Sequence, residues 1–132
     1  MSRVLIVDDD PVIRRLLEVN FRLEGFTVDT AEGGEAALES ARAERPDAVV
    51  LDLTMPNIDG FEVCRRLHSE TDGSPIAVVI VSARSREEDR AEAALAGAIA
   101  YMTKPFDPAD LVRTIRGAIE GPGGQERPGS TS

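Results

Sequence analysis

The sequence has 132 residues, which fits one domain and is long enough to bury a substantial hydrophobic core. Hydrophobic residues make up 42% of the chain and charged residues 30%, which is typical of a globular domain. Its 15 basic and 24 acidic side chains give a formal net charge of −9. Such a surface repels nucleic acid and anionic lipid, so we expect no direct binding of this segment to nucleic acid or to a membrane.

The sequence also bears on the compartment of the protein. No apolar run approaches the roughly 18 residues that predict a membrane-spanning helix. The first residues lack the cleavage pattern of a signal peptide. The single cysteine, Cys64, cannot form an internal disulfide, which favours a reducing compartment. We therefore expect a cytoplasmic protein in which Cys64 is a buried thiol.

The first apolar run, residues 4–7, predicts a buried strand that ends at Asp8. A helix should follow, with Asp10 as its N-cap, Pro11 at its first position and Gly25 at its C-terminal end. Residues 26–30 alternate in character, as a half-exposed edge strand does. The residues expected on the buried side of the helix are Ile13, Leu16, Leu17 and Leu23, opposite Arg14, Glu18 and Arg22.

The middle of the chain repeats this arrangement. Residues 35–44 predict a weaker amphipathic helix. Residues 48–52 predict a buried strand, and a turn rich in breaker residues follows it at once. Asp59, with Glu62 three residues later, is typical of a helix start. The residues expected to point inward on these two helices are Leu38, Ala41, Phe61, Val63, Cys64 and Leu67.

Residues 76–81 and 99–102 predict two further strands, the first of which ends at Ser82. Between them, Ser85 and Glu88 predict the start of a helix. The stripe expected to face inward on that helix consists mostly of small residues, namely Ala91, Ala94, Leu95 and Ala98. Because such a stripe buries little area, we expect this helix to be loosely held.

The last helix should begin at Asp107-Pro108, after a turn at 104–106. After Gly121 the composition changes to Gly, Pro and Ser, which predicts a disordered tail or linker over 121–132 behind a domain of residues 1–120. Strands thus alternate with helices five times. This order predicts a parallel sheet covered by helices on both faces. The inward residues of the last helix should be Leu111, Val112, Ile115 and Ile119.

Polar side chains stand at the ends of four predicted strands: Asp8 and Asp9, then Asp52, Ser82 and Lys104. The carboxyl ends of parallel strands open on the same rim of a sheet, where ligands bind. Clustered carboxylates there repel one another unless a cation relieves them, and their oxygens suit Mg²⁺. A solvated acidic turn with helix caps is the alternative. The matching positions of the serine and the lysine favour a site.

Over about residues 3–120 the chain resembles the receiver domains of bacterial two-component response regulators. Each matching fragment is short, but the ordered set at this spacing is specific. The resemblance implies an α/β, flavodoxin-like (βα)5 fold, a single doubly wound parallel sheet with strand order 2-1-3-4-5. The fragments are Ile-Val-Asp8-Asp9, Val-Leu-Asp52-Leu-Thr-Met-Pro, Asp59-Gly60, Val-Ser82-Ala and Lys104-Pro105-Phe106.

The resemblance also implies roles for these residues. Asp52 would accept a phosphoryl group from the phosphohistidine of a sensor histidine kinase or phosphotransfer protein. Asp9, Asp52 and the backbone carbonyl of Thr54 would hold Mg²⁺, with Asp8 acting through water. Lys104 would pair with a phosphoryl oxygen and precede a cis peptide bond. Such a domain is not an enzyme in the usual sense but a phosphoacceptor that assists its own phosphorylation and dephosphorylation.

A switch is implied as well. Ser82 would bond to the phosphoryl group, and Tyr101 would turn into the space it leaves, relaying the change to a face made by 84–97, Tyr101 and 107–119. For Tyr101 the alternative is partial burial with its hydroxyl in water. Thr54 and Arg84 stand at positions that tune the phosphoryl lifetime. We expect a lifetime longer than that of fast-cycling members.

Two further questions stay open in the sequence. Asp8-x-Asp10 after an apolar strand also resembles the start of haloacid-dehalogenase-type phosphohydrolases, with Asp8 as nucleophile, although Pro11 and the missing second acidic pair argue against it. The output of a receiver domain could be a downstream effector protein or an output domain beyond residue 121, and phosphorylation could be linked to formation of a homodimer.

Overall fold

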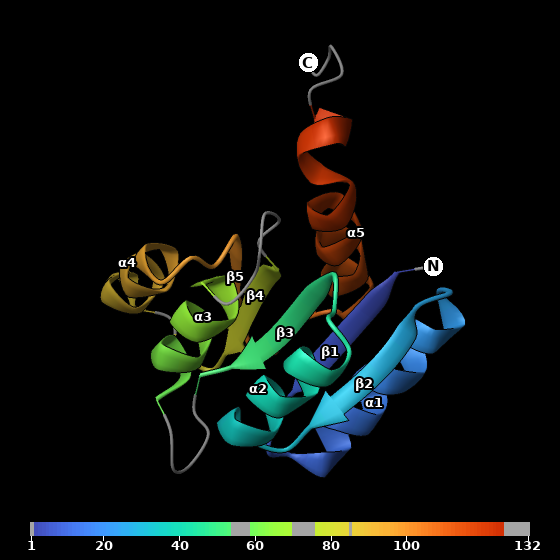
Figure 1. Ribbon diagram of the computed structural model, residues 1–132. Coiled ribbons are helices and arrows are strands. Elements are labelled where there is room, and N and C mark those ends of the chain that lie inside the picture. The colour runs from blue at the N-terminus through green and yellow to red at the C-terminus, as the bar shows by residue number, and fades with distance from the viewer. Residues whose placement is uncertain (1, 54–58, 70–75, 85, 126–132) are drawn as a thin grey trace.

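The computed structural model describes residues 2–53, 59–69, 76–84 and 86–125, with 121–125 described through their backbone alone. Within these ranges strands and helices alternate along the chain (Figure 1). The strands are β1 (Arg3–Val7), β2 (Thr27–Ala31), β3 (Ala48–Asp52), β4 (Ala77–Ser82) and β5 (Ala100–Thr103). The helices are α1 (Pro11–Leu23), α2 (Gly34–Ala43), α3 (Gly60–Ser69), α4 (Glu87–Leu95) and α5 (Pro108–Gln125).

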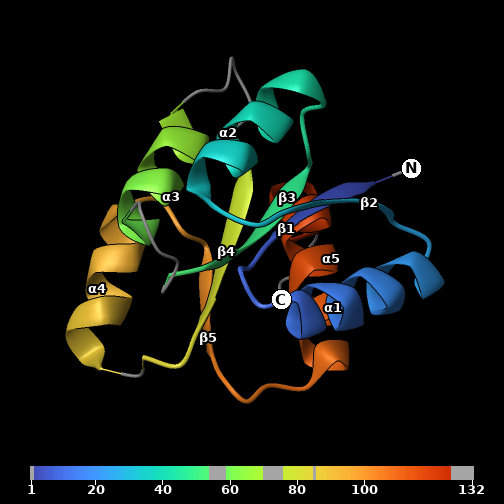
Figure 2. The same cartoon turned by 90° about the horizontal axis from the view of Figure 1, so that it is seen from below.

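The strands form one parallel sheet in the order β2-β1-β3-β4-β5. This order confirms the predicted doubly wound fold and places β3 at the centre. Seen along the sheet, α1 and α5 cover one face, and α2 and α3 cover the other (Figure 2). None of the helices in the described ranges is both long and apolar enough to cross a membrane.

Two hydrophobic cores lie on the two faces of the sheet, because successive residues of a strand point to opposite sides. In β1, Leu5 and Val7 pack with α2 and α3, whereas Val4 and Ile6 pack with α1 and α5. All five residues of β3 are buried. The continuous apolar runs in the sequence therefore mark strands that are covered twice, as predicted.

Helix α1 begins and ends as its sequence predicts. The Asp10 carboxylate accepts a hydrogen bond from the N–H of Val12 at 2.9 Å, and Gly25 adopts a φ of 94° just after the helix. The inward side was predicted only in part. Leu17 is buried, but Leu16 and Leu23 are 44% and 80% exposed. The helix carries apolar residues around much of its circumference, so their spacing alone did not select the face that packs on the sheet.

The prediction for the inward stripe of α4 was wrong. Ala91, Ala94 and Leu95 are exposed, the last of them by 89%, and Ala98 is only half-buried. The buried residues are instead Asp89, Ala93 and Ala96. A displacement of two residues turns a side chain by a little more than half a turn around a helix, so the predicted stripe faces solvent. Small residues on several sides of α4 gave no clear periodicity.

The ends of two helices differ from the predictions. Arg86 rather than Ser85 precedes α4 as its N-cap, without a side-chain capping bond, and Ser85 lies outside the described residues. The backbone of α5 continues to Gln125, past the predicted end at Gly121. The part of the predicted tail at 126–132 also lies outside the described residues.

Candidate functional site

The register of the strands brings the predicted polar residues together. Val7 is paired with Leu51, so Asp8 and Asp52 follow side by side at the ends of β1 and β3. Asp52 is paired with Val81, which places Ser82 one residue beyond it on β4. Ser82 is in turn paired with Thr103, directly before Lys104. Four strand ends therefore meet at one rim of the sheet.

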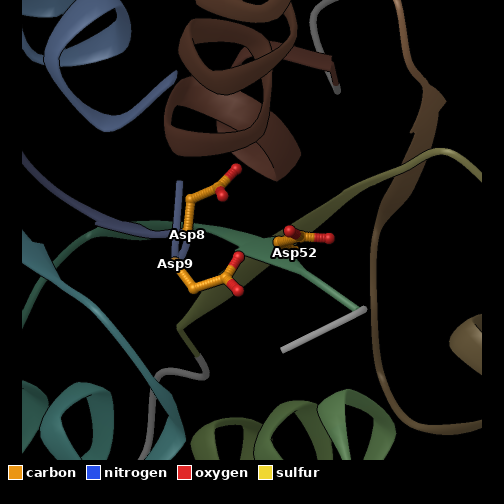
Figure 3. A group of neighbouring side chains, drawn as sticks. All are labelled: Asp8, Asp9 and Asp52. Atoms are coloured by element: carbon orange, nitrogen blue, oxygen red, sulfur yellow. The ribbon is translucent and has the colours of Figure 1, made fainter. Parts of the chain in front are cut away.

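The carboxylates of Asp8, Asp9 and Asp52 lie close together at this rim (Figure 3). One oxygen of each lies within 4.8 Å of the others. Asp8 and Asp52 are each only 3% exposed, whereas Asp9 is open to solvent. Two buried carboxylates beside an exposed third form a strongly negative pocket.

Lys104 supplies the cation of this pocket. Its Nζ lies 3.3 Å from Oδ2 of Asp8 and 3.4 Å from Oδ2 of Asp52. Burial disfavours the ammonium form, but the attraction of Asp52 and Asp8 outweighs it and raises the pKa of Lys104. The Lys104–Pro105 peptide bond is cis, as the resemblance implied.

The environment of the pocket disfavours the ionised form of Asp8. Burial raises the pKa of Asp8, and the negative charge of Asp52 raises it further. The N–H of Asp10, which donates to Oδ1 at 2.9 Å, and the ammonium of Lys104 act in the opposite direction without reversing the shift. Arg14, predicted on the solvent side of α1, donates to the backbone carbonyl of Asp8 at 2.8 Å.

A chain of hydrogen bonds leads away from the rim toward α4. Ser82 is fully buried, and its hydroxyl accepts from the N–H of Arg84 at 3.1 Å. The carbonyl of Arg84 accepts from the Tyr101 hydroxyl at 2.9 Å. The Tyr101 hydroxyl therefore has a hydrogen-bond partner in the protein at a partly exposed position. The guanidinium of Arg90 stands 5.0 Å from the centre of the same ring.

Gly60, the first residue of α3, allows the chain to pass close to the backbone of Leu53. A Cβ on this residue would stand 2.7 Å from the Cα of Leu53, so only glycine permits the approach. Next to it, the Asp59 carboxylate accepts from the N–H of Phe61 at 2.9 Å, as the predicted helix start requires. Glu62 pairs instead with Arg65 and Arg66.

Some contacts near the site were not visible in the sequence. The buried Asp89, its partner Arg84 and the stacking of Arg90 on Tyr101 depend on how α4 packs. The one available signal was the spacing of Arg86 and Asp89, three residues apart, which suits an ion pair on a helix. Thr54, predicted to offer a carbonyl to the metal and to tune the lifetime, lies outside the described residues.

Comparison with known proteins agrees with this geometry. The family model of the response regulator receiver domain matches residues 4–116. The chain belongs to this family. It is 39% identical over 116 residues to the probable transcriptional regulatory protein TcrX of Mycobacterium tuberculosis, covering 88% of this chain and 49% of TcrX. It is 42% identical over 118 residues to the transcriptional regulatory protein CseB of Streptomyces coelicolor, covering 89% and 49%.

Solved structures of receiver domains have the same fold. A CheY-like response regulator receiver domain protein from Methanospirillum hungatei JF-1 superposes with a TM-score of 0.85 at 28% identity, covering 91% of this chain and 94% of that one. The BeF3-activated DrrB receiver domain superposes with a TM-score of 0.82 at 30% identity, covering 91% and 98%. The chain is thus a receiver domain of two-component systems, which is not a classical enzyme family.

The receiver domain spans about half the length of the curated relatives it matches. Their names speak of transcriptional regulation, which is a statement about those longer proteins. The family match argues against the phosphohydrolase alternative.

Proposed function

We propose that this receiver domain accepts a phosphoryl group on Asp52 from the phosphohistidine of a sensor histidine kinase or phosphotransfer protein. The observation that carries the proposal is the position of Lys104, whose ammonium lies between the carboxylates of Asp8 and Asp52 at the carboxyl ends of the strands. Phosphoryl transfer requires positioning and charge neutralisation more than covalent machinery, and this pocket offers both.

In the proposed reaction an oxygen of Asp52 attacks phosphorus while the bond from phosphorus to the histidine nitrogen breaks. The electron pair of that bond stays on the departing imidazole. Lys104 would pair with one phosphoryl oxygen and the Ser82 hydroxyl would donate to another. Hydrolysis at the same position would return the carboxylate, so the domain would assist both its phosphorylation and its dephosphorylation.

The donor set fits Mg²⁺. One ammonium cannot neutralise three carboxylates, and the oxygens of Asp9 and Asp52 lie close enough to share a hard cation. Asp9 and Asp52 would hold the ion directly and Asp8 through water, and Thr54 would add a carbonyl. When bound, the ion would neutralise charge that develops on the transferred group. Asp8, held by the Asp10 N–H, would keep the pocket negative enough to attract it.

The signal would pass to a partner through the face formed by α4, β5 and α5. Leu95 and Ile99 are 89% and 54% exposed there, and Ala91 and Ala94 are exposed beside them. Exposed apolar side chains of this kind favour an interaction surface at this place. The partner would be an effector protein, an output domain of the same polypeptide or a second copy in a phosphorylation-linked homodimer. We place the reaction in the cytoplasm, the compartment that the free, buried Cys64 favours.

The test is to incubate the protein with acetyl phosphate and Mg²⁺ and to locate the added mass by peptide mapping. Asp52→Asn should abolish labelling, and Asp8→Asn should retain an acceptor. Labelling that persists in Asp52→Asn and disappears in Asp8→Asn would show a phosphohydrolase-type nucleophile instead. Size measurement of the labelled protein would report the homodimer.

The lifetime of the phosphoryl group is part of the same proposal. Thr54 and Arg84 would obstruct water or cover phosphoryl oxygens, and we expect slower hydrolysis than in fast-cycling members. The decay of labelled protein after removal of acetyl phosphate measures this lifetime. A half-life of a few seconds would contradict it.

A further inference from the structure

Arg84 joins the rim of the site to two other elements. Its N–H donates to the Ser82 hydroxyl at 3.1 Å, and its carbonyl accepts from Tyr101 on β5 at 2.9 Å. Its guanidinium lies on the α4 side, with Nη1 3.6 Å from Oδ1 of Asp89. Arg84 therefore contacts Ser82, which is predicted to bond to the phosphoryl group. It also contacts Tyr101 and helix α4.

Asp89 is an unusual residue for the first turn of a surface helix. It is only 7% exposed, although its neighbours Glu87 and Glu88 are open to solvent. Burial of a carboxylate is costly unless a cation compensates it. The cations that face Asp89 are Arg84, at 3.6 Å, and Arg86, at 3.7 Å from Oδ2. Both separations exceed those of close charge-assisted hydrogen bonds, so neither arginine is locked in place.

We propose that the Arg84–Asp89 ion pair is a latch that a phosphoryl group on Asp52 opens by competing for the guanidinium. The proposal rests on the proposed function, because it requires a phosphoryl group beside Ser82. Such a group carries about −1.5 to −2 charges and several acceptor oxygens, against the single charge of Asp89. Guanidinium groups bind phosphate oxygens in a bidentate manner, which adds to the preference. No covalent bond changes in this step; the side chain of Arg84 turns from α4 to the rim.

Opening the latch has two consequences. Arg84 covers phosphoryl oxygens and slows hydrolysis, and Asp89 loses one of its two cations. Helix α4 buries only Asp89 and Ala93 along its length, so the weaker pairing of Asp89 loosens its first turn. Asp89 is thus a positioning residue, which acts on the phosphoryl group through Arg84 and transmits the change to the output face.

The lifetime of the phosphoryl group tests the latch through a cycle of variants. Wild type, Asp89→Asn, Arg84→Ala and the double variant are labelled with acetyl phosphate and Mg²⁺, and the decay of the label is followed. Asp89→Asn frees Arg84 and should lengthen the half-life by about threefold or more. The double variant should match Arg84→Ala alone. Glu87→Gln, which removes an exposed charge of the same turn, should behave as wild type.

Two outcomes of the cycle would overturn the latch. One is an unchanged half-life in Asp89→Asn. The other is that Asp89→Asn changes the half-life by the same factor in the wild type and in Arg84→Ala. A protein that takes no label on Asp52 would instead refute the proposed function, so the two failures are distinguishable. The Nε–H signal of Arg84 in nuclear magnetic resonance spectra gives a second test in the wild type. It should shift on addition of beryllofluoride and Mg²⁺, and a signal that stays in place would refute the latch even if Asp89→Asn does not fold.

Discussion

The ammonium of Lys104 lies 3.3 Å from Asp8 and 3.4 Å from Asp52, across the ends of three strands. It is a cation shared by two buried carboxylates, so its removal takes away the positive charge that offsets their repulsion. Lys104→Met should destabilise the protein by about 1.5–3 kcal/mol, the usual worth of hydrogen bonds to charged groups. It should also slow phosphorylation by acetyl phosphate at least about tenfold.

Lys104→Arg is the matched control for this prediction, because it keeps the charge and changes the shape. Urea denaturation measures the stability, and the initial rate of labelling on Asp52 measures the reaction. If Lys104→Met were labelled as fast as wild type, the lysine would have no part in neutralising the phosphoryl group.

The second prediction concerns the close approach of Gly60 to Leu53. Gly60→Ala would place a Cβ 2.7 Å from the Cα of Leu53. This is a backbone atom, so a side-chain rotation cannot relieve the clash. We expect a loss of about 1–3 kcal/mol, as for other overpacked sites. Gly117→Ala is the same chemical change in a helix where nothing lies within 4 Å of the added Cβ. It should stabilise the protein by about 0.5–1 kcal/mol. Equal effects of the two substitutions on thermal unfolding would contradict the close approach.

Most of the fold and the centre of the site could be predicted because the signals were local. The apolar runs before Asp8, Asp52 and Ser82 are long enough to define buried strands, and parallel strands carry their ends to one rim. The register between strands then places Lys104 beside two carboxylates that are distant in sequence. The prediction that these residues share a rim requires only parallel strands, whereas their register comes from the structure.

The packing of α4 could not be predicted in the same way. Alanines occur on several of its sides, so hydrophobicity did not distinguish Ala93 and Ala96 from Ala91 and Ala94. A buried Asp89 contradicts the expectation for a charged residue, and its contacts with Arg84 and Arg86 explain it. Leu95 was misplaced because a core prediction assigns apolar residues inward, whereas this side chain is exposed.

The third prediction tests this corrected orientation of α4. Because Leu95 is 89% exposed, Leu95→Ala should change the free energy of unfolding by no more than about 0.5 kcal/mol. Leu67→Ala on α3 removes the same atoms from a side chain that is 1% exposed and should cost about 2–5 kcal/mol. Urea denaturation of both variants provides the comparison. A large loss of stability in Leu95→Ala would instead support the sequence-based prediction that Leu95 faces inward.

The fourth prediction follows from the raised pKa of Asp8. Its ordinary value is 3.8, and burial and the charge of Asp52 raise it in the folded protein. When an acid binds its proton more tightly in the folded state, its contribution to stability is complete below the unfolded pKa. That contribution is lost as the pH rises through the folded pKa. At neutral pH the ionised Asp8 therefore lowers the stability of the fold.

Asp8→Asn mimics the protonated form and keeps an oxygen that can accept from the Asp10 N–H. It should stabilise the protein at pH 7.5 by roughly 0.5–2 kcal/mol, as stabilising single substitutions do. The difference from wild type should shrink as the pH falls toward 3.8, the ordinary pKa of this carboxyl. Asp110→Asn, at an exposed carboxylate paired with Arg113, should change stability little at any pH. The urea midpoints of these variants across this pH range measure the effect. An Asp8→Asn variant less stable than wild type at pH 7.5 would mean that attraction to Lys104 outweighs the cost of burying Asp8.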